Sequence, residues 1–208
     1  MLYILCNVIV GKGDVSLLPR TDILWIIGTF VCSMLFSLST SWTRSVHIYK
    51  TTRTCWVGSV RYQNAPIPPE EEENVSFALA ELNCYAVYLS QNTHFQFYDV
   101  YCKQQLWPIM HHIADVYGPL NLNDIGAKAQ QQLWFVYSTV HKMFREKVLE
   151  LYQARDLIWI HGFHLLLLPS FIRRRIPSAK IGYFFHTPFP SSEIWRTISR
   201  REELLLGE

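Results

Sequence analysis

Residues 156–201 read DLIWIHGFHLLLLPSFIRRRIPSAKIGYFFHTPFPSSEIWRTISRR, and this stretch decides the fold. It contains two short apolar runs, 157–160 and 181–185, separated by a leucine-rich and then basic segment, 164–175. A short, continuously apolar run is typical of a strand that is covered on both faces of a sheet. A right-handed crossover between two such strands makes them parallel. The stretch therefore predicts a strand–helix–strand unit, with polar loops at the sheet edge where open α/β folds bind ligands.

Three histidines follow these two predicted strands. His161 and His164 lie in the turn after the first strand, and His186 comes directly after the second. In a parallel unit all three would lie near one edge of the sheet. A metal pair of His161 and His164 has no third ligand placed in the sequence, and known zinc sites use three or four protein ligands. We therefore predict no metal site.

Strand and helix patterns also alternate upstream of this unit. We predict strands at 2–10, 53–57 and 85–89, and helices at 75–82, 93–117 and 133–151. The last helix has one apolar face, formed by Leu133, Val136, Tyr137, Val140, Phe144, Val148 and Leu151. This spacing predicts core contacts rather than a cofactor site. The acidic run 70–73 indicates a solvated helix N-terminus, which the helix dipole favours.

Composition sets broad limits on function. Half of the residues are apolar and 14% are aromatic, so the chain can build a core. A net charge of +2 gives no argument for a nucleic-acid partner. The five cysteines are scattered, and no pair has the spacing of zinc ligands. They predict free thiols in a reducing compartment, such as the cytoplasm.

Residues 1–53 form a divergent N-terminal segment. Within it, residues 23–43 carry no charge, and this length is enough to cross a bilayer. The second half of the run is rich in hydroxyl side chains, which favours a buried core segment instead. Membrane attachment through 23–43 stays as the alternative, and basic residues on both sides leave its orientation open. We place a separate domain at residues 54–208.

The motifs of this domain resemble the trehalose-6-phosphate synthase family of retaining glycosyltransferases. The family's His-Asp-Tyr-His-Leu run corresponds to residues 161–165 (HGFHL), and its His-x-Pro-Phe-Pro-Ser-Ser-Glu run corresponds to 186–193 (HTPFPSSE). Residues 97–108 (FYDVYCKQQLWP) are similar to the family's Tyr and Leu-Trp-Pro segment, in a wording closest to the large fused synthase-like forms. The resemblance covers residues 54–208, with the motifs in the family's order and spacing.

The resemblance implies a fold and a reaction. It implies a Rossmann-like parallel sheet with flanking helices, corresponding to most of the N-terminal, acceptor-side domain of a GT-B glycosyltransferase. It also implies trehalose biosynthesis in the cytoplasm, by transfer of glucose from UDP-glucose to glucose 6-phosphate, without a cofactor. The chain ends before the family's donor-binding residues and second domain, so we expect negligible turnover from it alone. An uncovered apolar face makes a synthase-complex subunit or an oligomer a plausible assembly.

Four site residues are carried over by position. Tyr98 and Trp107 would line the acceptor pocket, and His186 would face the transferred glucose as the catalytic residue. Gly162 stands where the family has an aspartate that accepts hydrogen bonds from the acceptor sugar, and a glycine cannot do so. The family's phosphate-binding arginine near the N-terminus also lacks a counterpart. Without the resemblance, we would interpret Tyr98 and Trp107 as ordinary aromatic residues of the core or the surface.

Three functions stay open at this point. The chain can be a piece of an active transferase, or a non-catalytic homologue that binds a sugar phosphate or a synthase partner. It can also be a membrane-attached interaction protein that uses residues 23–43 as its anchor. Restoring an aspartate at Gly162 and supplying the second domain would create activity in the first case only. Carbonate extraction of membranes tests the third.

Overall fold

The computed structural model describes residues 2–7, 54–62, 65–81, 83–111, 126–185, 187–196, 198 and 200–206. The apolar run 23–43 and His186 lie outside these residues, so the expectations for them stay predictions. Within the described part, no helix combines the length and apolar character that crossing a bilayer requires.

Five parallel strands form the main sheet, in the order β5-β2-β1-β6-β7. They are β1 (Leu2–Asn7), β2 (Thr54–Ser59), β5 (Cys84–Val87), β6 (Leu157–His161) and β7 (Lys180–Phe184). The predicted unit of two parallel strands is confirmed as β6 and β7, with Ile158 opposite Ile181. The Rossmann-like fold class is confirmed as well.

The order of the strands defines a switch point in the sheet. From β1 the chain steps outward to β2 and β5, then returns to the other side of β1 for β6 and β7. In open α/β sheets, ligands bind outside the carboxyl ends of the strands where the order reverses in this way. Here that point lies between β1 and β6, next to residues 161–165.

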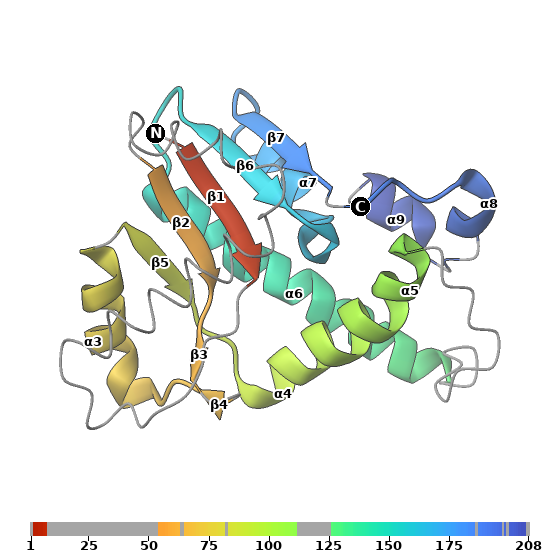
Figure 1. Ribbon diagram of the computed structural model, residues 1–208, viewed down its shortest axis with the longest axis horizontal. Helices are drawn as coiled ribbons and strands as arrows, with labels where there is room; N and C mark the ends of the chain where they lie inside the picture. The colour runs from red at the N-terminus through yellow and green to blue at the C-terminus, as the bar shows by residue number, and fades with distance from the viewer. Residues whose placement is uncertain are drawn as a thin grey trace.

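Helices cover the sheet and one of its ends. They are α3 (Pro69–Ala80), α4 (Gln91–His94), η2 (Phe95–Leu106, a π-helix), α5 (Trp107–Met110), α6 (Ala127–Leu151), the 3₁₀ turn η3 (Phe163–Leu165), α7 (Leu168–Arg175), α8 (Ser192–Trp195) and α9 (Arg201–Leu206). Figure 1 shows α6 crossing behind the sheet, while α4, η2 and α5 run past the arrowhead ends of the strands. A two-stranded antiparallel ribbon, β3 (Arg61–Tyr62) and β4 (Ala65–Pro66), follows β2.

The predicted apolar face of α6 is confirmed as the centre of the core. Leu133, Tyr137, Val140, Phe144 and Val148 are all buried in one cluster with residues of β6, η2 and α7, and Val136 and Leu151 are partly buried against it. Because these residues recur at helical spacing, a single stripe of α6 covers the sheet.

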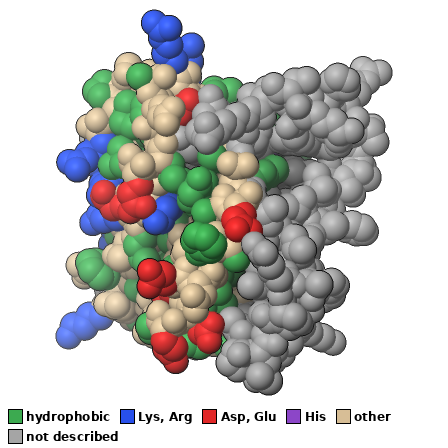
Figure 2. Space-filling view, turned by 90° about the vertical axis from the view of Figure 1, so that its left-hand side faces the viewer, with side chains coloured by type: hydrophobic (Ala, Val, Ile, Leu, Met, Phe, Trp, Pro, Cys, Tyr) green, Lys and Arg blue, Asp and Glu red, His purple; other side chains and the backbone are tan. Residues whose placement is uncertain are grey.

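Two prolines set where helices begin. Pro169 lies in the first turn of α7, so the helix begins at Leu168 after the η3 turn, and is not kinked. Pro69 opens α3, which starts earlier than predicted because proline is well suited to the first helical position. The acidic run 70–73 is therefore the solvated first turn of α3, as expected. Figure 2 faces the side of the molecule on which α3 lies in Figure 1, and it shows acidic and apolar side chains intermixed there.

Candidate functional site

The turn after β6 has a backbone conformation that requires glycine. Gly162 has φ 73° and ψ 169°, a combination that is nearly exclusive to glycine. Its N–H donates to the Phe184 carbonyl at 2.9 Å, and its carbonyl accepts from the Tyr183 hydroxyl. Both bonds tie the turn to β7. At the position where the resemblance predicts an aspartate, this chain thus has neither a carboxylate nor a backbone conformation suited to one.

The two residues after Gly162 connect this turn to η2 through ring contacts. Phe163 is buried, and its ring stacks on that of His164 with centroids 4.1 Å apart. The His164 ring in turn stacks on Tyr98, at 5.4 Å and an interplanar angle of 23°. The turn after β6 therefore contacts η2 directly.

The helix that receives these contacts is π-helical for twelve residues, Phe95–Leu106. A π-helix closes i→i+5 hydrogen bonds, so side chains four and five positions apart share a face. Asp99 and Lys103 of η2 follow this spacing, and it continues to His94 in α4 before them and to Trp107 and His111 after them. Segments of this kind are rare and frequently occur at functional sites.

Trp107 presents its indole at the end of this face. Its side chain is 40% exposed, and its ring stacks on His111 with centroids 4.1 Å apart. The carbonyl of Trp107 can only accept, so His111 Nδ1 is the donor of the 2.8 Å bond between them. His111 also meets Phe163 edge to face at 6.2 Å. Trp107 is thereby joined to the turn after β6 through one intervening ring.

These contacts form one continuous cluster of rings, which we call the ring cluster: Tyr98, His164, Phe163, His111 and Trp107. Three of the four predicted site positions, Tyr98, Trp107 and Gly162, thus lie in or directly beside it, at the switch point of the sheet. The fourth, His186, is outside the described residues. The sequence interpretation missed Phe163 and His111 as members, although the four-residue step from Trp107 to His111 was visible.

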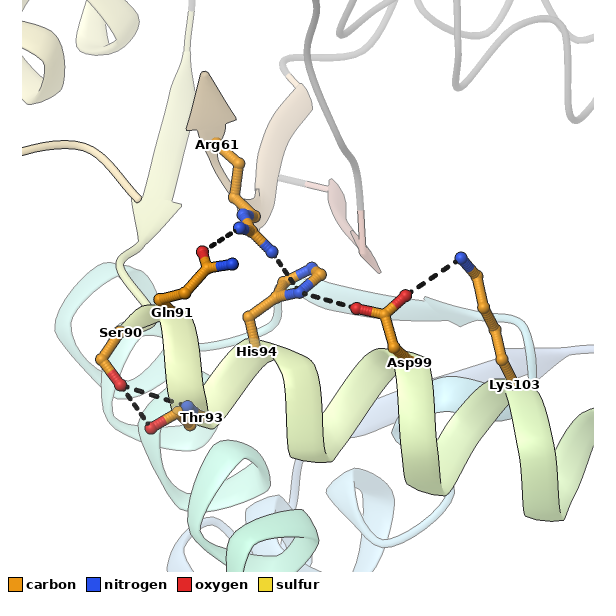
Figure 3. A network of polar contacts seen from close by, with 7 residues as sticks. All are labelled: Arg61, Ser90, Gln91, Thr93, His94, Asp99 and Lys103. Carbon is orange, nitrogen blue, oxygen red and sulfur yellow. Dashed lines mark hydrogen bonds and ion pairs between the residues drawn. The ribbon is translucent and has the colours of Figure 1, made fainter. Parts of the chain in front are cut away.

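A polar network lies along α4 and η2 and includes Arg61 of β3 (Figure 3). The Arg61 guanidinium, 4% exposed, donates to His94 Nδ1 and to Gln91 Oε1. Because Nδ1 accepts this bond, the His94 ring carries its proton on Nε2 and is neutral. Burial, followed by the charge of Arg61, lowers the pKa of His94 to about 4. Asp99 lies 3.7 Å from His94 Nδ1 and contacts Lys103 Nζ at 3.2 Å.

Tyr98 lies between this network and the ring cluster. Lys103 Nζ is 4.5 Å from the centroid of the Tyr98 ring, and the His94 ring is 5.2 Å from it. Burial raises the pKa of the Tyr98 phenol, and the Lys103 charge only partly offsets this effect. The hydroxyl is therefore protonated at neutral pH and available as a hydrogen-bond donor.

The described part of the chain contains no group of three or more His, Cys, Asp or Glu residues that could hold a metal ion. The site instead offers an exposed indole, a phenol and an ammonium group. Such groups can bind the apolar face of a sugar, its hydroxyls and an anion.

A parallel α/β sheet of this order, with aromatic and polar side chains gathered at its switch point, defines a Rossmann-like ligand-binding domain. The chain matches the model of glycosyltransferase family 20 over residues 31–207, and it belongs to this family.

Relatives and solved structures agree with this assignment. The chain is 42% identical over 158 residues to "Probable alpha,alpha-trehalose-phosphate synthase (UDP-forming) 10" of Arabidopsis thaliana, a match that covers 75% of this chain and 17% of the relative. It is 39% identical over 137 residues to alpha,alpha-trehalose-phosphate synthase (UDP-forming) 6 of the same plant, which covers 65% of this chain and 15% of the relative. The chain therefore spans less than a fifth of the length of these relatives.

Among solved structures, the N-terminal domain of Candida albicans trehalose-6-phosphate phosphatase superposes with a TM-score of 0.63 at 24% identity, covering 99% of this chain and 38% of that one. An alpha,alpha-trehalose-phosphate synthase of Burkholderia xenovorans in complex with glucose-6-phosphate gives 0.57 at 20% identity, covering 99% and 38%. At these identities the likeness supports the fold.

Proposed function

We propose that this chain forms the acceptor side of a trehalose-6-phosphate synthase and binds glucose 6-phosphate at the ring cluster. In the complete reaction, glucose passes from UDP-glucose to this acceptor and gives trehalose 6-phosphate and UDP. The observation that carries the proposal is the gathering of Tyr98, Trp107 and the turn at Gly162 at the switch point of the sheet. Family membership and the names of the relatives support the reaction type.

The chemistry of the two aromatic residues suits this acceptor. The exposed indole of Trp107 offers an apolar surface on which the C–H face of a hexose can stack. The protonated hydroxyl of Tyr98 can donate to a phosphate oxygen. His186 would position the transferred glucose by donating to one of its hydroxyls. No resident cofactor or metal is required, because UDP-glucose is itself the activated donor.

The donor half of the site would come from a second domain or a partner subunit. A retaining transfer needs both sugars held face to face, and we assign this chain the acceptor sugar only. Cys55, Cys84 and Cys102 are buried and form no disulfide, which agrees with a reducing compartment, and we propose the cytoplasm.

One observation favours a second candidate, a non-catalytic homologue that binds the sugar phosphate and regulates a synthase partner. Gly162 lacks the carboxylate that would accept hydrogen bonds from the acceptor, and its turn is fixed to β7 by two hydrogen bonds. Losing a charge-assisted hydrogen bond weakens binding by about 1.5–3 kcal/mol. Binding can survive such a loss, whereas a reaction that needs an oriented acceptor suffers more.

Calorimetric titration of the 208-residue chain tests the acceptor assignment. We expect weak binding of glucose 6-phosphate and none of UDP-glucose. Replacing Trp107→Ala removes the stacking surface and should weaken binding of glucose 6-phosphate about tenfold. Phe77→Ala is the matched control, because Phe77 is an exposed aromatic (72%) on α3. Equal affinity of the Trp107→Ala variant and the wild type would refute the acceptor pocket.

A further inference from the structure

Lys103 occupies a position between the two aromatic residues of the proposed acceptor site. It lies on the η2 face four residues before Trp107, and its Nζ is 4.5 Å from the Tyr98 ring centroid. Residues four apart on a helix have Cβ atoms about 5–6 Å apart. A hexose that stacks on Trp107 can span this separation with a phosphate on its exocyclic carbon, so the phosphate would reach Lys103.

The ammonium group is held in place but keeps donors to spare. Within the described part of the chain, Lys103 contacts the Asp99 carboxylate at 3.2 Å and the face of the Tyr98 ring. An ammonium has three N–H donors, and the carboxylate uses one of them. The side chain is 50% exposed, so the remaining donors are accessible to a ligand. A flexible lysine that is already positioned in this way loses less conformational entropy on binding.

The charges of the network leave a positive excess. Arg61 and Lys103 are cations, Asp99 is an anion, and His94 is neutral because Arg61 donates to its Nδ1. Two positive charges and one negative charge give a net charge of +1 for these four side chains. Asp99 therefore orients Lys103 without cancelling the attraction of the cluster for an anion, since Arg61 offsets the carboxylate from the other side.

We propose that Lys103 binds the phosphate of the acceptor sugar, beside the hydroxyl of Tyr98. This inference rests on the proposed function and assigns the residue that distinguishes a sugar phosphate from the free sugar. Trp107 would recognise the ring in both ligands, whereas Lys103 would contribute only when the phosphate is present.

The test compares three probes on the full 208-residue chain: glucose 6-phosphate, glucose and inorganic phosphate. Titrations use the wild type, Lys103→Gln, Lys103→Arg and, as control, Lys147→Gln. Lys147 is also ion-paired to a carboxylate within its own helix, with Glu150 at 2.6 Å on α6. We expect Lys103→Gln to weaken glucose 6-phosphate and phosphate binding tenfold or more, on the order of a charged hydrogen bond. Lys103→Arg should retain most of the affinity, and the control all of it.

The outcomes distinguish the assignment of Lys103 from the proposed acceptor site. Raising the salt concentration should weaken glucose 6-phosphate binding by the wild type, because salt screens the charge of Lys103. Binding by Lys103→Gln should depend less on salt, because this variant lacks that charge. If Lys103→Gln binds as the wild type does while Trp107→Ala does not, the acceptor site stands and the assignment of Lys103 is refuted. An equal loss for glucose and glucose 6-phosphate also refutes it, because Lys103 would then act through the Tyr98 ring alone. If the wild type binds no glucose 6-phosphate, both proposals fall.

Discussion

Helix α6 covers the sheet, whereas the π-helical segment η2 packs against α6 beside the ends of the strands, and the two regions bury different side chains. α6 buries rings and branched side chains at regular helical spacing, and Tyr137, Phe144 and Val148 have no exposed surface. Where α4 leads into η2, the buried side chains include the imidazole of His94, 1% exposed, and the guanidinium of Arg61, which donates to it from β3. Buried polar networks rigidify a site, but they depend on every partner being present. The α6 side is therefore held mainly by apolar packing, whereas the side of α4 and η2 also depends on a buried polar network.

The largest expected effect tests the α6 side of this comparison. Phe144→Ala leaves a cavity at the centre of the core, because Phe144 is fully buried. We expect a loss of about 3–5 kcal/mol in the free energy of unfolding, measured by urea denaturation. Phe135→Ala on the same helix is the control, since Phe135 is 61% exposed and should change stability by less than about 0.5 kcal/mol. Similar losses in both variants would contradict the assignment of the buried face.

Acidification should affect both sides, because each contains one buried neutral histidine. Burial lowers the pKa of His141 on α6 from 6.5 to about 3, partly opposed by its hydrogen bond to the Tyr137 carbonyl. The pKa of His94 is lowered from 6.5 to about 4 by burial and by the charges of Arg61 and Lys103, against Asp99. Below pH 6.5 the unfolded chain takes up protons that the folded chain does not, so stability falls with pH until the folded pKa is reached.

The expected slope is at most about 1.4 kcal/mol per pH unit for each histidine. Urea denaturation at pH 7.5, 6.5, 5.5 and 4.5 measures it, with little change expected between the first two values. His141→Leu should remove its share of the slope, while His94 continues to contribute until pH 4 is approached. An unchanged slope in the variant would exclude His141 as a source of the pH dependence.

The sequence predicted the α6 side better than the η2 side, for a physical reason. The buried stripe from Leu133 to Val148 follows from apolar spacing alone, and so do the strands at 157–160 and 181–185. The polar network did not follow, because Arg61 comes from another segment and the five-residue step from His94 to Asp99 runs from α4 into the π-helix. Local patterns assume α-helical spacing, so they do not place such residues on one face.

The sequence also predicted only part of what the structure shows at Gly162. The missing aspartate was visible from the resemblance, but the left-handed backbone at this position was not. Conformation at a turn depends on tertiary hydrogen bonds, here to Phe184 and Tyr183 of β7. The departure from the family at Gly162 therefore stays a prediction from the resemblance, and the structure adds the positive φ at this position.

The smallest expected effect concerns this turn. Gly162→Asp places a side chain at φ 73° and ψ 169°, and such strain costs about 1–3 kcal/mol. Gly126→Asp is the matched control: Gly126 is the N-cap of α6 with φ −50°, no atom lies within 4 Å of an added Cβ, and aspartate is a favoured N-cap residue. The control should be neutral or slightly stabilising in the same urea denaturation. A Gly162→Asp variant as stable as the wild type would mean that the turn accepts an aspartate without strain. In that case the lost carboxylate could be restored by this single substitution, and the case for a non-catalytic homologue would weaken.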